Sequence, residues 1–85
     1  MEVAYFPKAN DDLAFWRKSG NKQVQKRISD LIENIKKTPF SGLGQPEALK
    51  YDLSGLWSRR INSEHRIIYE VEKIIVNIYS LRGHY

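Results

Sequence analysis

The chain has 85 residues, 41% of them hydrophobic and 28% charged, which predicts one globular domain over residues 1–85 and argues against disorder. It lacks cysteine, long apolar runs and a signal-peptide pattern, which excludes disulfides, thiolate catalysis, cysteine-ligated zinc and membrane spans and predicts a cytoplasmic protein. Fourteen Lys and Arg against ten Asp and Glu give a net charge of +4, which favours a polyanionic partner but is also ordinary for a small domain.

The N-terminal part of the chain predicts a strand followed by two helices. Residues Val3 to Phe6 form a short apolar run, and Pro7 ends it, so we expect a strand there. Asn10 then predicts the cap of a first helix, because its side chain can accept a hydrogen bond from a free N–H. Gly20 ends this helix, and Asn21 caps the next one.

The second helix has the clearest pattern in the chain. Its apolar residues recur at steps of four, three, one and three and form a single stripe: Val24, Ile28, Leu31, Ile32 and Ile35. Lys36 and Lys37 suit the negative end of the helix dipole, and Pro39 stops the helix. We expect the stripe to pack on the core.

Residues 40–55 form an irregular segment. They contain three glycines and a proline and show no sustained hydrophobic period. An irregular segment of this length in so small a domain is often functional, and this one contains Glu47 and Lys50.

The C-terminal part of the chain predicts three strands. Ile, Val, Tyr and Trp are frequent in three consecutive stretches: Leu56–Asn62, His65–Val71 and Ile74–Arg82. Short connections between them predict antiparallel hairpins. The whole chain is therefore expected to be an α+β protein of order β-α-α-β-β-β, in which a helical hairpin covers one face of a small antiparallel sheet.

The polar residues supply the groups needed for metal-free cleavage of RNA. Attack of a 2′-hydroxyl on the neighbouring phosphate needs a base, an acid for the leaving 5′-oxygen, and cations that stabilise the charged phosphate. Glu or His can be the base, His the acid, and Arg the cation. The available residues are Glu47, Lys50, Arg59, Arg60, His65, Arg66, Arg82 and His84. Composition shows that the groups for this chemistry are present, but it does not favour this chemistry over others.

Other chemistries are disfavoured. The chain has no Gly-rich phosphate loop, no HExxH motif and no serine in a nucleophile elbow. Its two histidines have no nearby acidic cluster, which makes a metal centre improbable. We therefore expect a protein that works without a metal or cofactor.

Five motifs stand in order along most of the chain. They are Thr38-Pro39-Phe40, residues 42–50 (GLGQPEALK), residues 53–61 (LSGLWSRRI), residues 64–69 (EHRIIY) and the closing His84-Tyr85. In content and order they resemble the YoeB/Txe family of bacterial toxins, which belongs to the RelE-like superfamily. The resemblance implies a RelE-like fold and an mRNA endoribonuclease that acts in the ribosomal A site. It also implies a cognate YefM-like antitoxin, a toxin homodimer, and operator DNA binding only through the toxin–antitoxin complex.

The resemblance also implies roles for individual residues. By motif position, Glu47 would be the general base, His84 the general acid, and Arg66 the cation that stabilises the phosphate. The residues implied to bind or orient RNA are Lys50, Arg60, Glu64 and Tyr85. The chain departs from the family at Gly83, where the family ending has Tyr before the His, and loss of that ring would weaken base stacking or loosen His84.

Strand register decides which arginine lies on the face of Arg66. A two-residue connection at Ser63-Glu64 places Arg59 on that face, whereas a connection of one or three residues places Arg60 there. The roles implied by the resemblance require the odd connection. Because side chains alternate along a strand, His65 should point away from Arg66 and be structural or peripheral.

A function of a different class stays open. A non-enzymatic toxin or nucleic-acid-binding module of the same superfamily, such as a gyrase inhibitor or a corepressor, would use the basic surface. It would not need Glu47 and His84 together.

Overall fold

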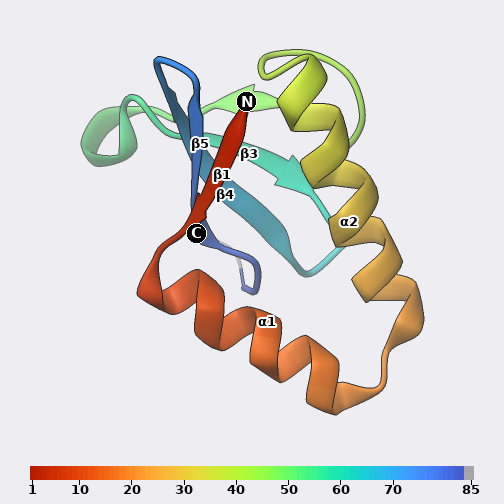
Figure 1. Ribbon diagram of the computed structural model, residues 1–85. Helices are drawn as coiled ribbons and strands as arrows, with labels where there is room; N and C mark the ends of the chain where they lie inside the picture. Colours follow the sequence, from red (N-terminus) through yellow and green to blue (C-terminus); the bar gives the residue numbers. More distant parts are fainter. Residues whose placement is uncertain (84–85) are drawn as a thin grey trace.

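Two helices lie on the same side of a five-stranded sheet in the computed structural model, which describes residues 1–83 (Figure 1). The elements in chain order are β1 (Glu2–Tyr5), α1 (Pro7–Ser19), α2 (Lys22–Lys37), β2 (Glu47–Ala48), the short 3₁₀ helix η1 (Tyr51–Leu53), β3 (Trp57–Arg60), β4 (Arg66–Glu72) and β5 (Ile75–Ser80). This arrangement confirms the predicted α+β class and the helical hairpin on one face. No helix within residues 1–83 is long and apolar enough to cross a membrane.

The sheet differs from the prediction in two respects. Its strand order is β1-β5-β4-β3-β2, and β1 pairs parallel with β5, whereas the other pairs are antiparallel. Two helices and three strands separate β1 from β5 along the chain, which is ample length for the crossover that a parallel pair requires. In addition, β2 pairs with β3 and adds a strand inside the segment predicted to be irregular.

The first helix starts earlier than predicted. Pro7 is its first residue, where a fixed φ suits the helix and the missing N–H would have no partner anyway. Phe6 occupies the cap position in an extended conformation, without a side-chain hydrogen bond. Asn10 lies inside the helix, and its Nδ2 donates to the Tyr5 carbonyl at 3.4 Å. The prediction that Asn10 caps the helix is wrong because Pro7 both ends the strand and opens the helix.

The turn between the helices and the stripe of α2 are as predicted. Gly20 ends α1 with a φ of 71°, in the left-handed region that favours glycine. The Asn21 side chain accepts a hydrogen bond from the Val24 N–H at 3.0 Å. All five residues of the predicted stripe are buried in one cluster with Trp16 and the inward side chains of β4 and β5. Burial of this stripe places α2 over the sheet.

The odd register is found between β3 and β4. Arg60 lies directly opposite Arg66, and Arg59 lies opposite Ile67. Ile67 belongs to the core cluster, so Arg59 points toward the helices and the Arg60–Arg66 pair points away from them.

The connection between β3 and β4 explains this register. The Ile61 N–H donates to the His65 carbonyl at 3.0 Å, which leaves three residues in the turn. Inside the turn, the Asn62 Oδ1 accepts from the N–H groups of Glu64 and His65 at 2.9 and 2.8 Å. An asparagine that bonds to the backbone two and three residues ahead is typical of a tight turn.

Candidate functional site

The face of the sheet opposite the helices carries the predicted base and the predicted phosphate-binding arginine. Glu47 on β2 lies opposite Ser58 on β3, and Ser58 lies opposite Ile68 on β4. Two strand spacings therefore separate Glu47 from Ile68, and Arg66 lies two residues further along β4. Standard sheet spacings put the Cα atoms of Glu47 and Arg66 about 12 Å apart. This leaves room for a phosphate group between the carboxylate and the guanidinium.

The Arg66 side chain is half-buried and bends back over the turn that precedes its strand. Its Nη1 donates to the carbonyls of Asn62 and His65 at 2.9 and 3.2 Å. Among residues 1–83, Nε and Nη2 of Arg66 have no hydrogen-bond partner. One edge of the planar fork can thus receive two phosphate oxygens, which is the geometry that suits an arginine–phosphate contact.

The Arg60–Arg66 pair concentrates positive charge at one point of this face. Like charges directly opposite each other on neighbouring strands destabilise a sheet. The ion pairs found within residues 1–83 join other side chains, on α1 and α2, and none neutralises these arginines. An anion bound between them would remove the repulsion, so the pair is an electrostatic site for a negatively charged group.

The other predicted RNA-binding residues surround this pair. Glu64 is exposed in the turn before β4, and Lys50 is exposed at the start of η1, three residues after Glu47. Arg60 is exposed as well. These side chains rim the same face with both signs of charge.

The predicted acid His84 and the predicted RNA contact Tyr85 lie outside the described residues. The chain leads toward them through Gly83, which lies beside Arg66: the Arg66 N–H donates to the Gly83 carbonyl at 3.1 Å. The Gly83 N–H in turn donates to Nδ1 of His65 at 2.8 Å.

His65 is a structural residue, as predicted. Its ring stands edge-to-face with Trp16 of α1, with centroids 4.9 Å apart. It therefore faces the helices, away from the Arg66 guanidinium.

Arg59 is a structural residue as well, although the sequence left it available as a site cation. Its side chain is fully buried, and all five of its N–H donors are used. The acceptors are the Tyr69 hydroxyl, the Asn34 side chain and the carbonyls of Thr38, Ser41 and Leu43. Arg59 thereby fixes the segment of residues 38–43 that leads to β2 and Glu47.

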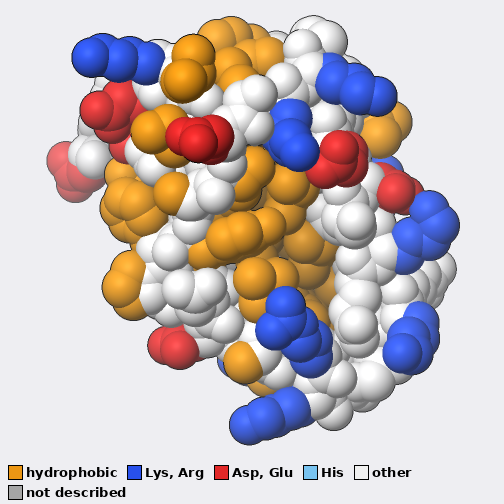
Figure 2. Space-filling view, viewed as in Figure 1, with side chains coloured by type: hydrophobic (Ala, Val, Ile, Leu, Met, Phe, Trp, Pro, Cys, Tyr) orange, Lys and Arg blue, Asp and Glu red, His pale blue; other side chains and the backbone are white. Residues whose placement is uncertain are grey.

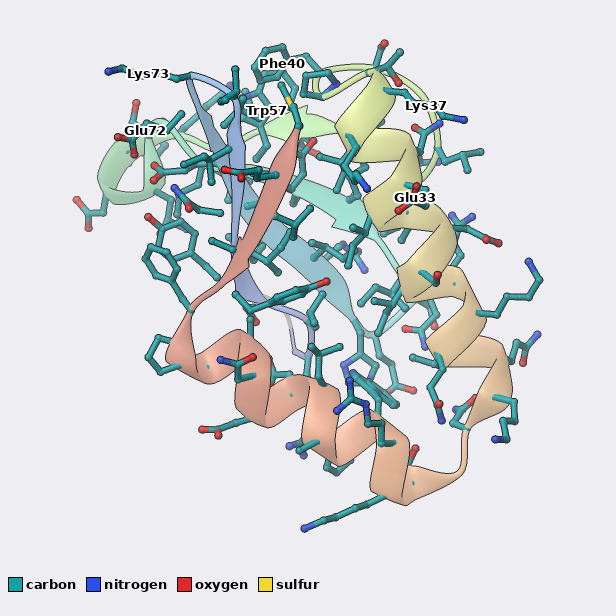
Figure 3. The ribbon with its side chains drawn as sticks, in the orientation of Figure 1. Glu33, Lys37, Phe40, Trp57, Glu72 and Lys73 are labelled. Atoms are coloured by element: carbon teal, nitrogen blue, oxygen red, sulfur yellow. The ribbon has the colours of Figure 1, made fainter. Side chains whose placement is uncertain are left out.

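The same segment is held by an aromatic contact. The rings of Phe40 and Trp57 lie side by side with centroids 4.8 Å apart (Figure 3). This contact makes Trp57 a packing residue. Arg59 and Trp57, which both lie on β3, together anchor this segment. Glu47 of β2 pairs with the same strand.

Glu70, Asn77 and Tyr79 form a hydrogen-bonded cluster on the same face, to which the sequence interpretation gave no role. Glu70 accepts hydrogen bonds from the Tyr79 hydroxyl at 2.8 Å and from the Asn77 side chain at 3.2 Å. The bond to Glu70 raises the pKa of Tyr79 above its usual value of 10.0, and burial adds to the rise. Alternation along β4 was the available signal, since it puts Glu70 on the face of Arg66. The cluster bounds the basic part of the face.

A hollow of about 260 Å³ opens on the helical side of the molecule. It lies between α1, α2 and the end of β1, and its floor is apolar, with Leu13, Trp16, Ile28 and Ile32 among its walls. Figure 2 shows apolar side chains gathered in the middle of this side, with both basic and acidic side chains around them. Within residues 1–83 none of the predicted site residues lines this hollow. No three His, Asp or Glu residues of this range lie close enough to hold a metal ion.

Comparison with known proteins decides the family. The family model described as "YoeB-like toxin of bacterial type II toxin-antitoxin system" matches residues 5–85. The chain belongs to the YoeB family. Toxin YoeB of Escherichia coli K12 is 41% identical to it over 85 residues and covers 100% of both chains. Toxin YoeB of Synechocystis sp. is 50% identical over 85 residues, which are 100% of this chain and 98% of the relative.

Solved structures agree with this assignment. The "YoeB/ParE toxin from Agrobacterium tumefaciens" matches the YoeB-family chain with a TM-score of 0.95 at 41% identity and covers 100% of both chains. The toxin of the "YoeB-YefM complex from Staphylococcus aureus" matches with a TM-score of 0.90 at 36% identity, covering 100% of this chain and 98% of that one. The chain is therefore a toxin of a bacterial type II toxin–antitoxin system with the RelE-like fold that its motifs imply.

Proposed function

We propose that this toxin is a ribosome-dependent mRNA endoribonuclease that inhibits translation by cutting the transcript in the ribosomal A site. The observation that carries the proposal is the Arg60–Arg66 pair, which lies on the same sheet face as Glu47. Two cations that form no ion pair within residues 1–83 suit a phosphodiester, and a carboxylate on the same face suits a proton acceptor. Membership of the YoeB family supports the same assignment.

The reaction needs only the chain's own residues. Glu47 takes the proton of the ribose 2′-hydroxyl, and the freed oxygen attacks the adjacent phosphorus. As the bond from phosphorus to the 5′-oxygen breaks, His84 donates a proton to that oxygen. Arg66 stabilises the negative charge through the edge formed by Nε and Nη2. The products are a 2′,3′-cyclic phosphate and a 5′-hydroxyl, and no metal takes part.

The remaining site residues bind and orient the transcript. Lys50 and Arg60 attract phosphates from the rim of the face, and Glu64 orients the RNA from the turn before β4. Tyr85 stacks on an unpaired base, a contact that contributes about 1–3 kcal/mol per base in proteins that bind single strands.

Partners follow from the structures of relatives. The Staphylococcus aureus relatives are described as a YoeB dimer and as a complex of YoeB with YefM. We propose that this toxin also forms a homodimer and is held inactive by a YefM-like antitoxin. A segment with acidic side chains would complement the cations of the site face. Operator DNA is contacted only through the toxin–antitoxin complex.

Growth of cells that express the toxin tests the proposal. Glu47→Gln, Arg66→Ala and deletion of His84 and Tyr85 should each restore growth, whereas Glu72→Gln, an exposed carboxylate at the far end of β4, should leave the toxin active. Mapping of transcript 5′ ends should reveal new ends that disappear when translation is blocked. Full toxicity in all three site variants would overturn the residue roles. DNA damage with intact mRNA would favour a non-enzymatic toxin instead.

A further inference from the structure

Gly83 is held by hydrogen bonds with two consecutive residues, His65 and Arg66. Its N–H donates to His65 Nδ1 at 2.8 Å, and its carbonyl accepts from the Arg66 N–H at 3.1 Å. Both backbone polar groups of Gly83 are thus satisfied by the start of β4. The position of Gly83 is thereby tied to the residue that carries the proposed phosphate-binding guanidinium.

The imidazole of His65 is itself held by α1. Its ring stands at 85° to the ring of Trp16, a favourable edge-to-face arrangement. Trp16 is buried, and its Nε1 donates to the Leu81 carbonyl at 2.9 Å. The Leu81 N–H donates to Asp12 at 2.9 Å, and Asp12 lies on α1, as Trp16 does. The last described residues are therefore attached to α1 at Leu81 and to β4 at Gly83.

The hydrogen-bond acceptor in this contact is the Nδ1 atom of His65. A side chain without an acceptor at this position would leave the Gly83 N–H unpaired.

Gly83 has no side chain whose packing could fix its position. Glycine loses more conformational freedom on folding than any other residue. Its φ of 92° lies in the left-handed region, and no neighbouring atom lies within 4 Å of the position a Cβ would take, so sterics alone do not fix it. The hydrogen bond that Gly83 donates to His65 and the one it accepts from Arg66 supply the order that a packed side chain would otherwise provide.

We propose that His65 is a positioning residue for the cleavage reaction. It holds Gly83, which precedes the proposed acid His84 in the chain, beside Arg66. The proposal rests on the proposed nuclease function. Proton donation to a leaving oxygen depends steeply on placement, and a displacement of about 1 Å can lower a rate by about 100-fold.

Three substitutions of His65 distinguish the contribution of its hydrogen-bond acceptor from that of its aromatic ring. His65→Phe keeps a ring against Trp16 but removes the acceptor. His65→Asn places an acceptor oxygen where Nδ1 lies, and His65→Gln carries the same amide one methylene further out. With mRNA on programmed ribosomes, His65→Phe and His65→Gln should lower kcat by about 10- to 100-fold with little change in KM. His65→Asn should retain most of the activity.

Hydrogen exchange of the Gly83 amide gives a readout that does not require catalysis. Exchange should be faster in His65→Phe than in the wild type and His65→Asn, in samples that thermal unfolding shows to be folded. Wild-type kcat in His65→Phe would overturn this inference alone and leave the proposed nuclease standing. Equal loss of activity in His65→Phe and His65→Asn, with slow Gly83 exchange in both, would also overturn it. A wild-type toxin that cuts no transcript would overturn the proposed function itself.

Discussion

Arg59 carries its positive charge into the core, and within residues 1–83 it forms no ion pair with a carboxylate. Its charge is balanced by oxygen dipoles, three of them from backbone carbonyls of the segment that leads to β2. A buried charge is tolerated only when its donors are all satisfied. The planar guanidinium with five donors meets this condition, and it explains why an arginine occupies an inward position of β3.

Replacement of Arg59 should reveal this dependence. Arg59→Lys keeps the charge but offers three donors for five acceptors, so the free energy of unfolding should fall by about 3 kcal/mol. Urea denaturation measures the change. Arg60→Lys, its exposed neighbour, is the matched control and should change stability by less than about 0.5 kcal/mol. A loss below about 1 kcal/mol in Arg59→Lys would contradict the role assigned to the guanidinium.

The contrast between Arg59 and Arg60 marks the limit of prediction for single residues. Alternation predicts that the two point to opposite faces, but only the length of the turn decides which one faces the core. That length depends on the hydrogen bonds of Asn62, which the sequence alone does not specify. Glu47 and Arg66 were located by their motifs rather than by any local physical signal, since isolated charged residues are common on every surface.

Among the elements, α2 was predicted well because its period extends over several turns and needs no knowledge of its partners. β2 was not predicted, since two residues are too few to show alternation. The parallel pairing of β1 also escaped prediction because the partner strand is far away in the sequence. Pro7 shows a third limit of prediction, because the same residue both ends the first strand and begins α1.

The segment before β2 makes a close approach to both α2 and β3. The Gly44 carbonyl accepts from the Arg60 N–H at 2.7 Å, and a Cβ on Gly44 would lie 2.8 Å from Leu31 Cδ2 and 3.1 Å from the Arg60 carbonyl. Its φ of 82° also favours glycine. Glycine is therefore required here for space as well as for conformation.

Two alanine substitutions distinguish these requirements. Gly44→Ala combines backbone strain with crowding and should destabilise the toxin by about 2–4 kcal/mol. Gly20→Ala has a comparable φ of 71° with nothing within 4 Å of its Cβ, so strain alone should cost about 1 kcal/mol. Thermal unfolding of both variants provides the comparison. Equal losses in the two proteins would show that the approach of this segment to α2 is not tight.

For the whole molecule, two tyrosines with raised pKa values link stability to alkaline pH. Burial raises the pKa of Tyr69 above 10.0, although the bond from Arg59 partly opposes the rise. Burial likewise raises the pKa of Tyr5. Since the unfolded chain releases these protons first, it binds fewer protons than the folded chain above pH 10. The stabilisation is complete below that pH and is lost as pH rises through the raised pKa values.

The urea midpoint should therefore fall as the pH rises above 10. Tyr69→Phe removes one of these groups, so its midpoint should fall less steeply with pH, even if the variant is less stable at neutral pH. Tyr51→Phe is the control, because Tyr51 is 92% exposed, and it should follow the wild type. Parallel curves for all three proteins would mean that Tyr69 does not contribute to the loss.

The central place of β5 affects how the toxin is made. It is the last of the five strands to be synthesised, yet it lies between β1 and β4. While residues 1–74 are being translated, β1 has no neighbour to pair with, and the apolar stripe of α2 has only part of a sheet to cover. Such distant pairings close slowly. Each newly translated molecule should thus pass through an interval of incomplete folding, during which chaperones or proteases can capture it before it does any harm.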